Sequence, residues 1–266
     1  MQPEPWARIH PTARLGSQVT VGPGSVIEAW SVIGAQARIG PGAYIGPHAR
    51  IGEGVQVGPG CRVDAGACIG GAGPTQGVRV PVVLGANCHV GEHALIEGGL
   101  EAPTVLEDEA FVMARCRVAP GAVLGRGSVV TNNSCIGSGA RLDPRSVVGG
   151  FCYVAPGVHI GTRVMVGAFS RIGADVPPYA LVDGDPPRLY DVNRVGLRRA
   201  GAGPAVREAL HRAFRLLFRS PTPLPEVLAQ LAGDAKRHAE VRELLEFAQR
   251  RPRSLEMWRQ WGKGHE

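Results

Sequence analysis

Residues 33–57 read IGAQARIGPGAYIGPHARIGEGVQV, and they place an aliphatic side chain at every sixth position. The same step of six continues outward in both directions. One run of these aliphatic anchors extends from Ile9 to Ile69, a second from Leu84 to Ile96, and a third from Leu106 to Ile172. The repeat therefore covers the first two thirds of the chain and is the feature that determines the fold.

A period of six fits neither a helix nor an ordinary strand. An α-helix returns apolar residues after three or four positions, and a half-buried strand after two. A short strand followed by a turn does fit, because stacked turns place each anchor above its equivalent in the next coil, about 4.8 Å away. The residue four positions after an anchor is usually small, as at Ala37, Cys61 and Ser128. We therefore expect a parallel β-helix with narrow corners.

The repeat is interrupted twice and then ends. We expect loops near residues 70–83 and 97–105 that project from the solenoid on its binding face. Beyond residue 177 the spacing of apolar residues becomes helical, as at Val206, Leu210 and Phe214. The sequence thus predicts a β-helix over residues 1–177, and a linker followed by a C-terminal helical domain over residues 178–266. We expect three helices there, capping the open end of the solenoid.

The composition excludes several classes of protein. The chain opens without a basic segment followed by an apolar stretch, and no apolar run is long enough to cross a membrane, which predicts a cytoplasmic protein. The net charge of +6 is compatible with an acidic carrier protein or a nucleotide phosphate. Nucleic-acid binding is disfavoured, because no known motif or aromatic platform accompanies the arginines.

Metal and disulfide chemistry are also disfavoured. The six cysteines contain no CxxC pair, and most of them fall in the small-residue slot of the repeat. His89 and His93 are the candidate zinc ligands, but a third imidazole one coil away from both is missing. We expect neither a metal nor a cofactor.

Four segments carry a resemblance to a known family. They are residues 163–167 (RVMVG), 175–179 (DVPPY), 192–199 (VNRVGLRR) and 213–220 (AFRLLFRS). In these segments the chain resembles the UDP-N-acetylglucosamine O-acyltransferases of lipid A biosynthesis. The resemblance implies a left-handed solenoid with 18 residues per coil, assembled as a homotrimer, so that Ile33, Ile51 and Ile69 stack in one ladder. It also implies transfer of a 3-hydroxyacyl chain from acyl carrier protein, or a related transfer from coenzyme A, to a nucleotide sugar.

The catalytic motif of that family is altered in this chain. The family base lies in a His-aliphatic-Ala-His-Asp motif, and the matching residues 117–121 read RVAPG, so Pro120 stands at the position of the base. The supporting histidines align with Glu97, Gly139 and Ala155. Proline has no titratable group, so the family mechanism cannot be copied directly.

The repeat arithmetic suggests a replacement for the missing base. Val118 follows Ile96 by 22 residues, which is one coil plus a loop of four, so these two anchors should stack. Glu97 is then the nearest candidate base, with His93 as the second. The alternative is that Glu97 is a solvated carboxylate at the edge of the loop, paired with an arginine such as Arg117.

The resemblance also implies three substrate-binding positions. Arg171 aligns with a glycine at the far end of the acyl groove, which suggests a short or polar acyl group, while Asn193 and Arg199 match positions that contact UDP. Arg199 could hold a phosphate with two hydrogen bonds. Alternatively, Arg171 extends into solvent, and Arg199 belongs to a solvated basic face.

Two functions remain open from the sequence. The first is an acyltransferase acting on a nucleotide sugar, which the loops, the tail, Asn193 and Arg199 favour. The second is a catalytically silent relative that binds a nucleotide sugar or serves as a trimeric scaffold, which the loss of every motif histidine favours.

Overall fold

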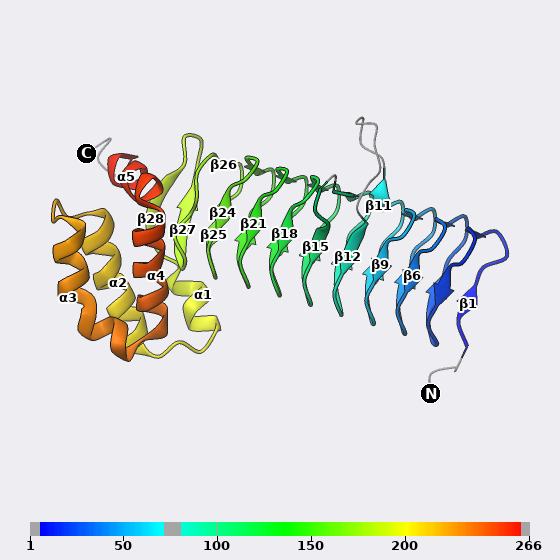
Figure 1. The fold of residues 1–266 in the computed structure, drawn as a ribbon, viewed down its shortest axis with the longest axis horizontal. Helices are drawn as coiled ribbons and strands as arrows, with labels where there is room; N and C mark the ends of the chain where they lie inside the picture. The colour runs from blue at the N-terminus through cyan, green and yellow to red at the C-terminus, as the bar shows by residue number, and fades with distance from the viewer. Residues whose placement is uncertain (1–5, 72–80, 100, 262–266) are drawn as a thin grey trace.

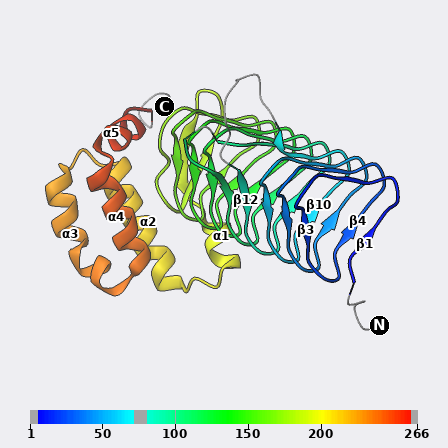
Figure 2. The ribbon, with the colours of Figure 1, turned by 45° about the vertical axis from the view of Figure 1, so that its right-hand side comes forward.

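The computed structural model describes residues 6–71, 81–99 and 101–261, and it forms a parallel β-solenoid of about nine turns followed by helices (Figure 1). Three sheets run the length of the solenoid, and every third strand joins the same sheet. Figure 2 shows the coils stacked one behind another, with the helices gathered at the C-terminal end. The prediction of a parallel β-helix with a helical C-terminal region is confirmed.

The strands are short, and most contain two residues. Sheet A consists of β1 (Arg8–Ile9), β4 (Val26–Ile27), β7 (Tyr44–Ile45), β10 (Arg62–Val63), β13 (His89–Val90), β16 (Phe111–Val112), β19 (Val129–Val130), β22 (Val147–Val148), β25 (Met165–Val166), β27 (Ala180–Asp183) and β28 (Arg188–Val192). Sheet B consists of β2 (Arg14–Leu15), β5 (Val32–Ile33), β8 (Arg50–Ile51), β11 (Cys68–Gly71), β14 (Leu95–Glu97), β17 (Arg117–Val118), β20 (Cys135–Ile136), β23 (Tyr153–Val154) and β26 (Arg171–Ile172). Sheet C consists of β3 (Thr20–Val21), β6 (Arg38–Ile39), β9 (Gln56–Val57), β12 (Val82–Leu84), β15 (Thr104–Leu106), β18 (Val123–Leu124), β21 (Arg141–Leu142) and β24 (His159–Ile160).

The aliphatic anchors form continuous ladders in the interior. Ile33 pairs with Ile51, and Ile51 with Ile69, as the repeat predicts, and all three are buried. Ile9 and Leu15 depart from the expected burial, being 43% and 38% exposed. They belong to the first described coil, and their strands β1 and β2 lie at the ends of their sheets, where the described residues place no further strand beside them.

The narrow corners of the solenoid explain the small residues of the repeat. Ala37, Cys61 and Ser128 are buried at the positions four residues after an anchor. At Gly34, which directly follows the anchor Ile33, the coils approach so closely that a Cβ would lie 2.5 Å from the Glu53 backbone nitrogen. A side chain could be placed there only if the two coils moved apart.

The two interruptions of the repeat separate consecutive strands of the solenoid by longer segments. β14 ends at Glu97 and β15 begins at Thr104, and the register across the interruption is Ile96 opposite Val118, which confirms the predicted stacking. At the other interruption β11 ends at Gly71 and β12 begins at Val82. Residues 72–80 of that expected loop lie outside the described residues.

The expected linker after residue 177 contains a β-hairpin that extends sheet A. Leu181 of β27 pairs with Met165 of β25 in parallel, and β28 returns antiparallel to β27. Aliphatic residues of β27 continue the sheet although the period of six has ended. Strands of sheet A thus continue to Val192, beyond the predicted domain boundary at 177/178. That boundary stays a prediction.

Five helices follow within the described residues, where the sequence predicted three. They are α1 (Arg194–Arg199), α2 (Pro204–Phe218), α3 (Leu224–Arg237), α4 (Ala239–Arg250) and α5 (Pro252–Trp261). The predicted helices correspond to α2, α3 and α4. The short helices α1 and α5 were missed because each offers few apolar repeats from which a period can be recognised.

Polar contacts hold the helices against the last coils. The Trp258 indole N–H of α5 donates to the Asp175 carbonyl at 2.7 Å, and the Tyr179 hydroxyl donates to the Glu243 carboxylate of α4. Burial, together with this hydrogen bond, raises the pKa of the Tyr179 hydroxyl above its ordinary value. Among the described residues, no helix is both long enough and apolar enough to cross a membrane.

The ladder can be tested by truncating an interior anchor. We expect Ile51→Ala to lower the free energy of unfolding by about 2–5 kcal/mol, because it leaves a cavity between two covered neighbours. The matched change Ile9→Ala, at the open first coil, should cost less than about 1 kcal/mol. Urea denaturation followed by circular dichroism measures both; equal losses would show that coil stacking does not bury the ladder.

Candidate functional site

The strongest candidate for a chemically active group is a buried carboxylate at the end of β14. Glu97 is 2% exposed, and its Oε2 lies 2.7 Å from Nη2 of Arg117, on the neighbouring strand β17. The guanidinium of Arg117 is half-exposed on the outer side of sheet B. The sequence left open that Glu97 is a solvated carboxylate paired with Arg117. The pairing with Arg117 is confirmed, but the carboxylate is not in solvent, because the stacked coils enclose it.

The carboxylate is incompletely satisfied by the protein. Its contact with Arg117 is close but not aligned as a hydrogen bond, and Oε2 accepts no other hydrogen bond from the described residues. A buried oxygen with unused lone pairs costs free energy unless something else provides a donor. A substrate hydroxyl or a water molecule could provide that donor.

The backbone around Glu97 is fixed by a buried threonine. The Thr104 hydroxyl donates to the Glu97 carbonyl at 2.6 Å and accepts from the Gly121 backbone N–H at 2.9 Å. This threonine connects the interruption after β14 to the turn that contains Pro120. Pro120 itself contributes only its carbonyl, which accepts from Gly139 N–H at 2.9 Å. The position that holds the base in the resembled family therefore performs a backbone role here.

His93 does not join this carboxylate. It lies exposed in the turn that precedes β14, in the left-handed backbone region at φ +55°, and it lines a polar cavity with Glu92 and Arg115. Glu97 is at the opposite end of the same strand, at another edge of the solenoid. His89 occupies a third environment on sheet A, where its Nε2 lies 2.6 Å from Asp64 and its ring stacks on Phe111.

The predicted substrate-binding residues lie far from Glu97 within one chain. Arg171 is on β26, four strands along sheet B from β14, which corresponds to roughly 19 Å at the usual strand spacing. Arg199 is exposed in the last turn of α1. Asn193 caps that helix, since its Oδ1 accepts from Gly196 N–H at 2.9 Å and its Nδ2 donates to the Arg163 carbonyl at 2.9 Å. The structure therefore assigns the Asn193 amide a structural role.

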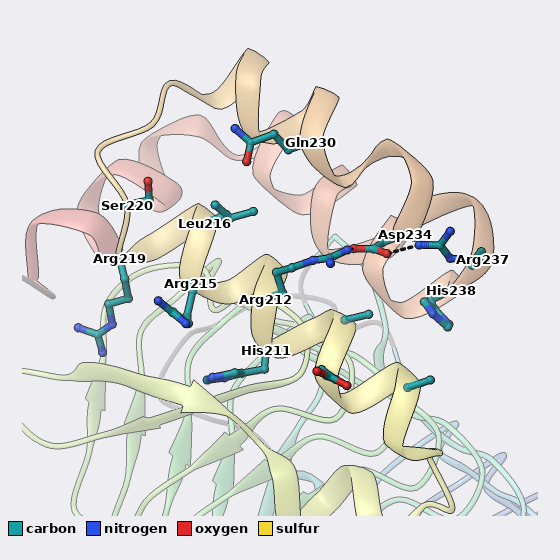
Figure 3. Close-up of a pocket in the computed structure, with 13 residues that line it drawn as sticks. His211, Arg212, Arg215, Leu216, Arg219, Ser220, Gln230, Asp234, Arg237 and His238 are labelled. Atoms are coloured by element: carbon teal, nitrogen blue, oxygen red, sulfur yellow. Dashed lines mark hydrogen bonds and ion pairs between the residues drawn. The ribbon is translucent and has the colours of Figure 1, made fainter.

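A large basic groove between α2 and α3 was not identified from the sequence. It has a volume of about 860 Å³ and runs beside Arg212 and Arg215 of α2, Arg219 directly after that helix, and Arg237 of α3 (Figure 3). The first three follow one another at spacings of three and then four residues, which is the spacing of one helix face. That spacing of arginines is the sequence feature from which the groove could have been predicted.

One buried acidic residue joins α2 to α3 at the groove. Asp234 is buried, and its two oxygens contact Arg212 and Arg237, the latter at 2.7 Å. Arg219 donates to the Leu189 carbonyl of β28 at 2.8 Å, which fixes α2 against the hairpin. Arg215 is exposed in the groove. Because two carboxylates, Glu208 and Asp234, face four guanidinium groups, the groove can attract an acidic ligand or partner.

Comparisons with known proteins agree along the chain. A family model described as UDP N-acetylglucosamine O-acyltransferase, domain 2, matches residues 175–255. Models described as bacterial transferase hexapeptide (six repeats) and as hexapeptide repeat of succinyl-transferase match residues 36–71 and 103–138. The helical tail and the solenoid are thus matched separately.

Individual relatives extend this agreement. The acyl-[acyl-carrier-protein]–UDP-N-acetylglucosamine O-acyltransferase of Thermodesulfovibrio yellowstonii is 34% identical over 183 residues, which cover 68% of this chain and 71% of the relative. The same-named enzyme of Thiobacillus denitrificans is 29% identical over 54% of this chain, and the match spans 56% of that relative's length. The structure of UDP-N-acetylglucosamine acyltransferase from Campylobacter jejuni is 29% identical with a TM-score of 0.77, covering 92% of this chain and 94% of that one.

Proposed function

This chain belongs to the UDP-N-acetylglucosamine O-acyltransferase family, and from that membership we propose that it transfers an acyl group from a carrier thioester to a hydroxyl of a nucleotide sugar. The observation that carries the proposal is the structural match along the whole chain, solenoid and helices together. We further propose that the reaction belongs to lipid A biosynthesis in the cytoplasm, as the family implies.

The basic groove supports acyl carrier protein as the donor. The names of the relatives give acyl carrier protein as the source of the acyl group. Carrier proteins are acidic, and the exposed Arg215, with its neighbours Arg212 and Arg237, presents positive charge along the groove. Coenzyme A remains an alternative donor, since its phosphates would also be attracted to these arginines.

In the proposed mechanism Glu97 is the general base. The acceptor hydroxyl attacks the thioester carbonyl, its proton passes to Glu97, and the sulfur leaves and takes up a proton as a thiol. Arg117 orients the carboxylate, and its half-exposed guanidinium can also bind an anionic part of the acceptor. His93 is the second candidate, at a different edge of the solenoid. Arg199 is proposed to hold the acceptor phosphate, Asn193 to position α1 for it, and Arg171 to limit the acyl chain.

Self-association would bring these separated residues together. On the outer side of sheet A, successive strands carry apolar side chains that are only partly buried in one chain: Phe111, Val129, Val147, Met165 and Leu181. The outer side of sheet B instead carries Arg117 and Arg171. We propose that a homotrimer covers the apolar side and assembles the site between neighbouring subunits.

The second candidate function is a catalytically silent relative that binds a nucleotide sugar or acts as a scaffold. The enclosed Glu97–Arg117 pair favours it, because a carboxylate engaged with a guanidinium must be released before it can accept a proton. The absence of a titratable group at Pro120 favours it as well.

Activity measurements separate the two functions. We expect transfer of 3-hydroxyacyl groups to UDP-N-acetylglucosamine to be about 10²–10⁴ slower than in a histidine-bearing relative. Glu97→Gln should abolish the remaining rate, whereas Glu92→Gln, an exposed carboxylate in the preceding turn, should leave it unchanged. Transfer that is indifferent to both Glu97→Gln and His93→Ala would place the site elsewhere. Absence of transfer with any donor, together with nucleotide-sugar binding, would establish the silent relative.

Acceptor binding tests Arg199 directly. Arg199→Ala should weaken UDP-sugar binding by about 1.5–3 kcal/mol, the usual contribution of a charge-assisted hydrogen bond. Arg198→Ala, the adjacent exposed arginine, serves as the matched control. If calorimetry gives the same affinity for wild type and Arg199→Ala, then Arg199 belongs to the solvated face of α1.

Charge reversal tests the groove as the donor surface. Arg215→Glu should weaken binding of acyl carrier protein by about tenfold, and the effect should shrink as salt rises because exposed charges are screened. Lys236→Glu makes the same change in charge on α3 at a residue that does not line the groove. Equal losses from the two variants would indicate a general effect of net charge.

A further inference from the structure

Two stacked phenylalanines stand exposed at one edge of the solenoid. Phe151 lies in the turn between β22 and β23, and Phe169 occupies the same position one coil later, between β25 and β26. Their ring centroids are 5.1 Å apart and the rings are nearly parallel, at 6°. The side chains are 57% and 70% exposed, values that are unusual for residues of this size.

Folding does not explain this pair. Both residues adopt left-handed backbone conformations, at φ +57° and +59°, which a bulky side chain adopts at a cost in free energy. Other coils place polar residues such as His48 and Asn133 at the same turn position. Exposed rings gain little from burial, so the polar residues used elsewhere would serve the turn equally well.

A shallow cavity of about 400 Å³, open to solvent, lies against the rings. It is lined by Phe151, Tyr153, Phe169, Arg171 and Asp185, together with Ser170. Phe169 is the last ring of the stack, because the next coil is replaced by the β27–β28 hairpin, whose turn contains Asp185. The cavity therefore combines aromatic surface with one positive and one negative side chain.

Hydrogen bonds fix the walls of this cavity. The Ser170 hydroxyl is buried, donates to the Gly167 carbonyl at 2.8 Å and accepts from the Gly184 backbone N–H at 2.9 Å. The Arg171 backbone N–H donates to the Gly184 carbonyl at 3.2 Å. The hairpin turn is thereby attached to the edge that carries Phe169, so little order has to be gained when a ligand binds.

We propose that this cavity binds a nucleotide, with its base stacked on Phe169. Planar bases stack on exposed aromatic rings, and this preference tolerates any base. Arg171 then pairs with a phosphate, and the Asp185 carboxylate accepts an N–H of the base. A hydrocarbon chain would offer neither charge a partner. The cavity shares Arg171 with the proposed end of the acyl groove but contains neither Glu97 nor Arg199, so loss of nucleotide binding and loss of acyl transfer can be measured separately.

Calorimetric titration of the full-length protein with ADP and UDP tests the proposal, with ribose 5-phosphate as the ligand that lacks a base. We expect at least one nucleotide to bind and ribose 5-phosphate not to bind. Phe169→Leu keeps an apolar side chain but removes the ring, and it should weaken binding by about 5- to 150-fold, the range for loss of one stacked base. Arg171→Gln should weaken the binding of ADP and UDP more than the binding of the corresponding nucleosides, which have no phosphate.

Two controls isolate this cavity. Trp30→Leu changes an exposed aromatic residue at the same turn position of an early coil, and it should leave affinity unchanged. Arg199→Ala should also leave the Phe169-dependent binding intact, which separates this site from the proposed acceptor site. Equal affinity of wild type and Phe169→Leu would overturn the proposal. Absence of nucleotide binding to the wild-type protein would also overturn it. If light scattering then showed that Phe169→Leu lowers the mass of the assembly, the two phenylalanines would be assigned to contact with a second copy of the chain.

Discussion

Hydrogen bonding between consecutive coils is the constraint on which the rest of the structure depends. Backbone N–H groups donate to carbonyls one coil further on, as from Arg38 to Val55 at 2.9 Å and from Tyr44 to Cys61 at 2.8 Å. This contact fixes the distance between coils and their register. The interior must then consist of aliphatic ladders with small residues at the corners, and a glycine such as Gly34 is needed where two coils approach most closely.

The same register places functional groups in rows along the solenoid. The pairing of β14 with β17 brings Arg117 to Glu97, although 20 residues and an interruption separate them in the chain. Register also keeps Glu97 and Arg171 apart, because both lie on sheet B but several coils from each other. A rigid stack cannot bend to join them. Within one chain, both residues can contact only a ligand that extends along sheet B over several coils.

Family membership and altered chemistry are compatible in this fold, because coil stacking makes few demands on outward-facing side chains. Pro120 fits its turn and its carbonyl accepts from the Gly139 N–H, so a proline at this position does not disturb the ladder. The ion pair between Glu97 and Arg117 likewise joins the end of β14 to β17, a structural contact that does not require a catalytic role. The solenoid can therefore persist while its reactive groups change, and activity has to be argued from the side chains themselves.

The sequence by itself determined the solenoid, the Ile33–Ile51–Ile69 ladder, the stacking of Ile96 on Val118 and three of the helices, because these follow from local periodicity and a constant coil length. It also identified Glu97 and a partner arginine by counting residues along the repeat. Only the tertiary structure decided that Glu97 is enclosed, that the Asn193 amide caps α1, and that α2 and α3 form a basic groove. The hairpin on sheet A and the cavity beside Phe169 were also decided there. Burial, capping and cavities depend on contacts between side chains that are far apart in the sequence, and a periodic pattern carries no information about those contacts.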